Sequence, residues 1–135
     1  MEKKIPVTIL ILFISFLGIY TSQAQQTAFF TEEIALIQKK ANEKTLNYYL
    51  IVDDSKVADY KIFNPDHLIH LDFSVTTEKH MENSTKISYT VTLLGEKNLG
   101  LNFLNRHLAM NNVNEVNVKE RIMNRSDFFM QYLIK

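Results

Sequence analysis

The stretch HLIHLDFSV, residues 67 to 75, holds the groups of this chain that are best placed to do chemistry. Apolar and polar residues alternate in it, as is typical of a β-strand with one dry and one wet face: Ile69, Leu71, Phe73 and Val75 against His70, Asp72 and Ser74. Residues two apart on a strand point the same way, so His70 and Asp72 are candidate ligands of one metal ion. Zinc needs three or four converging ligands, and this face supplies two. We therefore expect a solvated strand face that holds no metal and no other cofactor.

Other reactive groups do not form a recognisable catalytic site in the sequence. The chain has no cysteine, which excludes a thiol nucleophile or a thiolate metal site, and no GxSxG motif is present. The adjacent carboxylates Glu32-Glu33 and Asp53-Asp54 are sequence neighbours that cannot face each other across a substrate. His67 is expected on the opposite strand face, His80 in a loop and His107 on a helix. We expect no catalytic residues, although an enzyme assembled from scattered residues stays an alternative.

The first 26 residues have the pattern of a secretory signal peptide. Lys3 and Lys4 precede an uncharged and mostly apolar run, residues 5 to 20, and small residues follow at Ser22 and Ala24. A membrane-spanning helix takes about 20 apolar residues, which is longer than this run. We expect cleavage after Ala24, so that residues 1–24 are removed. The alternative is a retained anchor, which would make the protein a subunit of a membrane complex.

Residues 25–135 have the length of one domain with a single hydrophobic core. Removal of Lys3, Lys4 and Glu2 with the signal leaves 13 of the 15 Lys and Arg residues and 14 of the 15 Asp and Glu residues. A net charge near −1 gives no electrostatic reason to bind nucleic acid or an anionic membrane surface. An exported chain without cysteine must be stabilised by packing alone, which fits a bacterial periplasmic or surface protein.

The mature chain is predicted to open with a helix within residues 27–46. Four apolar residues recur there at steps of four, three and four, and so line one helix face: Phe30, Ile34, Ile37 and Ala41. Thr31 is the expected N-cap, and the lysines near the other end suit the negative end of the helix dipole.

Four short strands are predicted to follow. Residues 47–52 are aromatic and β-branched, and residues 56–63 alternate before a turn at 64–66. Residues 68–76 and 86–94 each carry four apolar residues at period two, which is typical of paired antiparallel strands with one solvated side. The polar residues 76–85 between them are expected to form an exposed hairpin end.

The last third of the chain is less regular. Leu101, Leu104 and Leu108 predict a helix over 99–110, with a polar side formed by Asn98, Asn102 and Asn105. Residues 113–123 fit both a strand and a helix. Residues 127–135 form either a helix capped by Ser126 or a strand.

Together these elements predict an α+β fold in which an N-terminal helix packs on a four-stranded antiparallel sheet, followed by a mixed C-terminal helical segment. The order of elements resembles the outline of cystatin-like and NTF2-like domains, although no motif of either family is present. The expected function is that of a small exported bacterial envelope protein that binds another envelope protein or a small ligand without catalysis. A small-ligand carrier or enzyme, with a pocket between helix and sheet, is the alternative.

Overall fold

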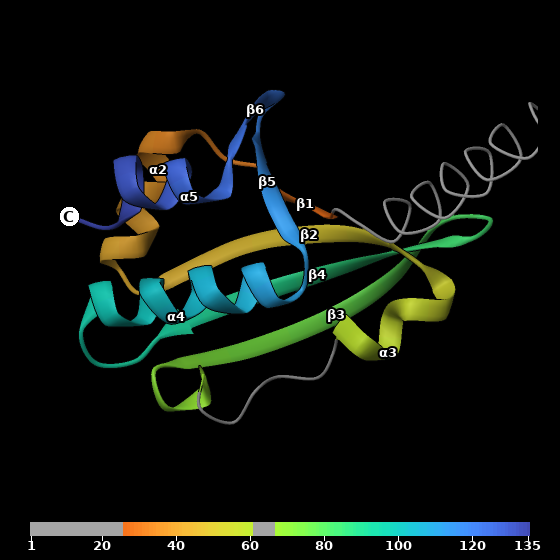
Figure 1. Cartoon of the computed structure of the whole chain (residues 1–135), viewed down its shortest axis with the longest axis horizontal. Helices are drawn as coiled ribbons and strands as arrows, with labels where there is room; N and C mark the ends of the chain where they lie inside the picture. Colours follow the sequence, from red (N-terminus) through yellow and green to blue (C-terminus); the bar gives the residue numbers. More distant parts are fainter. Residues whose placement is uncertain (1–25, 61–66) are drawn as a thin grey trace, which may run out of the picture.

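The computed structural model describes residues 26–60 and 67–135, which form an α+β fold around a six-stranded mixed sheet (Figure 1). The strands lie in the order β3-β4-β2-β1-β5-β6. Their bounds are Gln26–Phe30 for β1, Thr45–Asp53 for β2, Leu71–Met81 for β3, Ser84–Leu93 for β4, Val113–Val118 for β5 and Arg121–Asn124 for β6. The expected signal peptide with its cleavage site, and the expected turn at 64–66, lie outside the described residues.

Four α-helices and three other helical segments accompany the sheet in the described residues. The α-helices are α2 (Ile34–Asn42), α3 (Val57–Tyr60), α4 (Lys97–Met110) and α5 (Arg125–Phe128). The other segments are the 3-10 turns η1 (Asp54–Lys56) and η2 (His67–Ile69) and the π-helical turn η3 (Phe129–Leu133). None of the described helices is long and apolar enough to cross a membrane.

The predicted four-stranded antiparallel sheet behind an N-terminal helix is wrong in both parts. The first described element is strand β1, which pairs antiparallel with β2 and parallel with β5. The helix begins only at Ile34, with Glu33 at the N-cap position in place of Thr31. Phe30 misled the prediction, because it continues the helical spacing of Ile34 and Ile37 while its side chain is buried from a strand.

The strand predicted for residues 56–63 is also wrong over its described part. Residues 54–60 instead form η1 and α3. The Asp53 carboxylate accepts hydrogen bonds from the backbone N–H of Ser55, at 2.9 Å, and from its hydroxyl, at 2.7 Å. This side-chain cap satisfies a free N–H of the first turn and so favours helical over extended backbone at this point.

The predicted pairing of β3 with β4 is confirmed, with corrections at the start of β3 and at the turn. The expected connecting end at 76–85, with His80 in a loop, is wrong, because β3 continues through His80 to Met81. The strands pair antiparallel over almost their whole lengths, and the turn between them is only Glu82-Asn83. Leu71 faces the core, and so do four residues of β4: Ile87, Tyr89, Val91 and Leu93. Ile69 was expected on the same dry face, but it lies in η2 before the strand begins and is 67% exposed.

The two ambiguous C-terminal segments resolve into strands followed by a helix. Residues 113–123 fold back as β5 and β6 around Lys119 and Glu120, both of which have positive φ angles. Of the two alternatives for the end of the chain, the helix is the one observed, but its cap is Asn124, which accepts a hydrogen bond from the Ser126 N–H at 2.8 Å.

One face of the sheet carries the core, and the helices supply its other wall. Figure 1 shows α4 running along the sheet and α2 lying beside α5 at one end. Strand residues such as Leu50 and Ile87 meet helix residues such as Leu104 and Phe128 in one buried cluster. The other face of the sheet, which we call the polar face, carries exposed and half-buried side chains.

Candidate functional site

Helix α4 presents three differently used sides, and the first of them faces the sheet. With 3.6 residues per turn, its buried residues fall on one continuous stripe. The stripe consists of Gly100, Leu101, Leu104, His107 and Leu108. The three leucines confirm the sequence prediction, and the histidine is an addition to it.

The second side of α4 is polar and packs against the C-terminal end of the chain. The side-chain amide of Asn98 donates to the carbonyl of Lys135. The Arg125 guanidinium donates to the carbonyl of Asn105 at 3.2 Å and to its side-chain oxygen. Two of the three asparagines expected on a solvent-facing side are therefore used within the molecule, while Asn102 is exposed.

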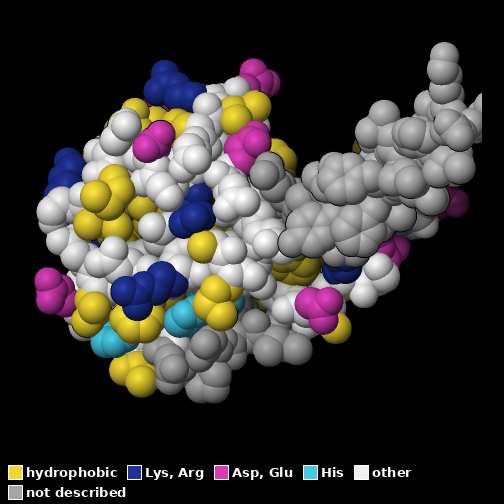
Figure 2. Space-filling view, in the orientation of Figure 1, with side chains coloured by type: hydrophobic (Ala, Val, Ile, Leu, Met, Phe, Trp, Pro, Cys, Tyr) yellow, Lys and Arg dark blue, Asp and Glu magenta, His cyan; other side chains and the backbone are white. Residues whose placement is uncertain are grey.

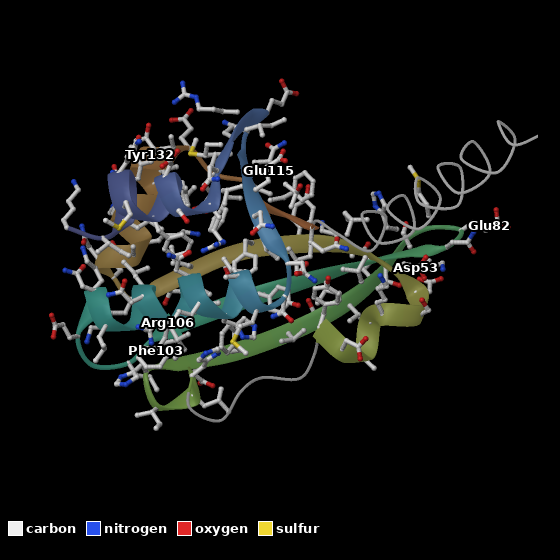
Figure 3. The ribbon with its side chains drawn as sticks, in the orientation of Figure 1. Asp53, Glu82, Phe103, Arg106, Glu115 and Tyr132 are labelled. Atoms are coloured by element: carbon white, nitrogen blue, oxygen red, sulfur yellow. The ribbon has the colours of Figure 1, made fainter. Side chains whose placement is uncertain are left out.

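The third side of α4 is exposed and largely apolar. Leu99, Phe103, Arg106 and Met110 follow one another at steps of four, three and four, which places them within about 60° of one another around the helix axis. Leu99 is 39% exposed and Met110 is 65% exposed. Figure 3 shows Phe103 and Arg106 projecting from the same side of the helix, and the guanidinium carbon lies 5.5 Å from the ring centroid.

The turn η2 lies against this third side and extends it. The His70 ring, directly after η2, packs on the Phe103 ring with 4.4 Å between centroids. Leu68 is 44% exposed, and its neighbour Ile69 is more exposed still. We call the following residues, all of them exposed except the half-buried Phe103, the α4–η2 patch: Leu68, Ile69, Leu99, Phe103, Arg106 and Met110. Figure 2 shows hydrophobic, basic and histidine side chains gathered over this lower part of the molecule.

A buried pair of histidines fastens η2 to α4. The Nδ1 atoms of His67 and His107 lie 3.3 Å apart, and both residues are at least 95% buried. The two rings are almost perpendicular, and the ring of Phe73 packs on His107 with 5.1 Å between centroids. Because Leu68 and Ile69 follow His67 in η2, the pair holds these two of the six patch residues next to α4.

The neighbours of His107 determine its protonation. The Asn111 side-chain nitrogen, which can only donate, lies 3.2 Å from Nε2 of His107. His107 therefore accepts at Nε2, carries its proton on Nδ1 and donates it to His67. Burial, and secondarily the charge of His67, lowers the pKa of His107 to about 4. At neutral pH this ring is uncharged and joined to its partner by a hydrogen bond.

The two sequence candidates for a metal site end up in different surroundings. Because β3 begins at Leu71, His70 lies outside the strand and turns its ring onto Phe103. Asp72 is exposed on β3, opposite Thr92. His70 and Asp72 therefore do not project from the same side of one strand, as a shared metal site would require. Within residues 26–60 and 67–135, no three or more histidine or carboxylate side chains are grouped to hold a metal ion.

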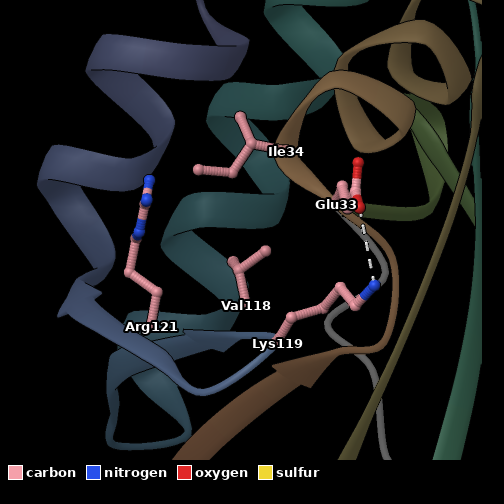
Figure 4. Close-up of a pocket in the computed structure, with 5 residues that line it drawn as sticks. All are labelled: Glu33, Ile34, Val118, Lys119 and Arg121. Atoms are coloured by element: carbon pink, nitrogen blue, oxygen red, sulfur yellow. Dashed lines mark ion pairs between the residues drawn. The ribbon is translucent and has the colours of Figure 1, made fainter.

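A surface pocket of about 390 Å³ lies between the start of α2 and the β5–β6 turn (Figure 4). Its apolar wall is Ile34 and Val118. Lys119 and Glu33 form an ion pair across it, with 3.6 Å between Nζ and Oε1. The lysine charge is thus already neutralised, which leaves Arg121 as the remaining cation of the lining.

The polar face of the sheet carries an aromatic stack of its own. The rings of Phe29 on β1 and Tyr49 on β2 are nearly parallel, 5.0 Å apart, and the Lys86 ammonium on β4 lies 4.4 Å from the Tyr49 centroid. Because β2 lies between β4 and β1, Tyr49 is held between the lysine and the phenylalanine. Ser88 lies opposite Tyr49 on β4, and Asn117 lies opposite Phe29 on β5, so the stack is flanked by a hydroxyl and an amide side chain.

The sequence contained a partial signal for the buried pair of His67 and His107. His107 follows Leu104 by three residues, so it belongs to the buried stripe and not to the solvent side. The place of His67 depends on η2, which has no clear local pattern. No protein family, characterised protein or solved structure is significantly similar to this chain, so its own geometry carries the functional argument.

Proposed function

We propose that this protein is a small exported bacterial envelope protein that works by binding, not by catalysis, and that the α4–η2 patch is its binding surface. The observation that supports the proposal is that α4 carries apolar residues on two sides, of which one is buried and the other exposed. Leu99 and Met110 gain nothing from their exposure to water, whereas contact with a partner would bury them favourably.

The composition of the patch supports a protein as the partner. Interfaces between proteins are enriched in aromatic residues, methionine and arginine at their centres. Phe103, Arg106 and Met110 provide all three classes on one helix side, and Leu68 and Ile69 add aliphatic surface next to them. A helix side with this spacing fits a partner helix or an apolar groove.

The proposed export rests on residues 1–24 of the sequence. If the signal is cleaved after Ala24, intact-mass spectrometry of the purified protein gives a chain that begins at Gln25. A mass that includes residues 1–24 would contradict the cleavage and favour the anchored membrane subunit. The measurement does not depend on the binding proposal.

The binding proposal is tested by photo-crosslinking in the cell that makes the protein. A photoreactive residue replaces Leu99 or Met110 in the patch and, as a matched control, Met130 on η3. Met130 is 65% exposed, as is Met110, but it lies outside the patch. We expect discrete adducts from positions 99 and 110 and none from position 130. Equal labelling at all three positions, or no adduct from the patch, would contradict the proposed surface.

A further inference from the structure

We propose that the partner seated on the α4–η2 patch is a second copy of this chain, bound antiparallel about a two-fold axis. The proposal rests on the binding function proposed above and names the partner that the geometry of the patch selects. A two-fold interface must be self-complementary, because the same surface is presented by both copies. The third side of α4 meets that requirement in its spacing and in its chemistry.

The spacing of the stripe is the same when it is read in either direction. Its steps are four, three and four residues, so an antiparallel copy of α4 falls into register with it. A two-fold axis midway between Phe103 and Arg106 places Leu99 opposite Met110 of the second copy. The same axis places Phe103 opposite the second copy's residue 106, and the relation holds in both directions.

The chemistry of these contacts is complementary as well. Leu99 and Met110 bury apolar surface against each other at both ends of the stripe. In the centre, the Arg106 guanidinium of each copy moves from the Phe103 ring of its own chain to the ring of the other copy. This exchange fixes the antiparallel register and adds little affinity, because the same kind of contact exists before binding.

Charge and size set the strength of the contact. The two copies of Arg106 approach each other near the axis, where their like charges repel, and salt reduces this repulsion. The patch has six side chains in each copy, compared with about 20–30 residues in a standard interface. We therefore expect a weak dimer, with a Kd of about 10–100 µM.

The mass of the protein in solution is the first test. The full-length gene is expressed, the protein is purified in the form that the cell makes, and sedimentation is followed from about 1 µM to about 300 µM, which brackets this Kd. We expect the mass to rise from monomer towards dimer, Met110→Glu to abolish the rise, and Met130→Glu to leave it unchanged. A monomer throughout, or equal loss in both variants, would overturn the inference.

Disulfide trapping tests the antiparallel geometry, and the natural absence of cysteine removes any background. Leu99→Cys and Met110→Cys are oxidised separately and as an equal mixture. Antiparallel pairing gives a covalent dimer in the mixture only, because two copies of position 99 lie about 16 Å apart along the axis, and a disulfide spans at most about 7 Å between Cα atoms. A dimer from either variant alone would overturn this geometry.

The dimer and the binding function can fail separately. An in-cell adduct at position 99 that has the mass of two chains supports both. An adduct with a different protein, together with a monomer at about 300 µM in solution, overturns the dimer and leaves the binding surface intact. If the patch gives no adduct of any kind, the function itself is overturned.

Discussion

The α4–η2 patch and the polar face of the sheet both carry aromatic side chains at the surface, but they differ in what surrounds the rings. On the polar face, Tyr49 has Phe29 on one side and Lys86 on the other, so its ring faces are already in contact within the molecule. On the patch, the Phe103 ring likewise contacts His70 and Arg106 of its own chain, but Leu99 and Met110 on the same helix side remain exposed.

An aromatic residue near the surface is therefore not by itself a sign of binding. The neighbouring residues decide: Ser88 opposite Tyr49 carries a hydroxyl that water solvates well, whereas Leu99 and Met110, on the same helix side as Phe103, are apolar and exposed. We therefore expect substitutions on the polar face to change stability and substitutions on the patch to change association.

The largest expected effect is a difference in the free energy of unfolding between substitutions on the two apolar sides of α4. Leu104 is fully buried, so Leu104→Ala should lower the free energy of unfolding by about 2–5 kcal/mol. Leu99→Ala, on the exposed side of the same helix, should change it by less than about 0.5 kcal/mol. Urea unfolding of dilute monomer measures both values. Similar losses from the two substitutions would mean that the third side of α4 is packed within the monomer.

The second effect concerns the histidine pair that holds η2 in place. The folded pKa of His107 lies below its ordinary value of 6.5, so the unfolded chain binds more protons between pH 6.5 and 4. The stability that the uncharged His107 contributes is therefore fully present above pH 6.5. The free energy of unfolding should fall by about 3 kcal/mol as the pH drops to 4. Urea titrations at several pH values measure the slope, and His107→Gln should flatten it. An equal slope in that variant would assign the acid sensitivity to other groups.

A smaller effect is expected on the polar face. Tyr49→Thr places a β-branched residue, which suits a strand, at this position but removes the contacts with Phe29 and Lys86, at a cost of about 2 kcal/mol. Tyr49→Phe retains the ring and serves as the control. Neither substitution should alter the concentration dependence of the sedimentation mass. If Tyr49→Thr abolished the dimer and Met110→Glu did not, the polar face, and not the α4–η2 patch, would be the surface of association.

The smallest effect concerns the ring next to Tyr49 in the sequence. The Tyr48 hydroxyl is buried and has no hydrogen-bond partner in the described structure. Tyr48→Phe removes this unsatisfied group and should raise the free energy of unfolding by about 1 kcal/mol. Thermal and urea unfolding measure the gain. A loss of stability would show that the hydroxyl does find a partner in solution.

The parts of the fold that were predictable are those with a local pattern. The β3–β4 hairpin was predicted because Leu71 on one strand and Ile87 and Val91 on the other recur at period two. The pairing of β1 with β5 was missed, because it joins Gln26 to Val113 across most of the chain and both strands are short. A parallel pairing of this kind leaves no signal in either segment alone.

The candidate surface was missed for a related reason. The sequence showed the helix, but its asparagines were taken for the solvent side, since polar residues are usually exposed. Whether Asn98 and Asn105 face water depends on Lys135 and Arg125, which reach α4 only through the tertiary fold. The outward position of Leu99 and Met110 follows from the same packing, so periodicity alone could not reveal it.

The central place of β1 has a consequence for how the chain folds. A strand from the beginning of the described chain lies between β2 and β5, so its outer edge stays without a partner until residues 113–118 are available. A chain synthesised from its N-terminus therefore cannot complete the sheet until residues 113–118 have been made. During synthesis, β1 waits with one edge open while the more than 80 residues between Phe30 and Val113 are added.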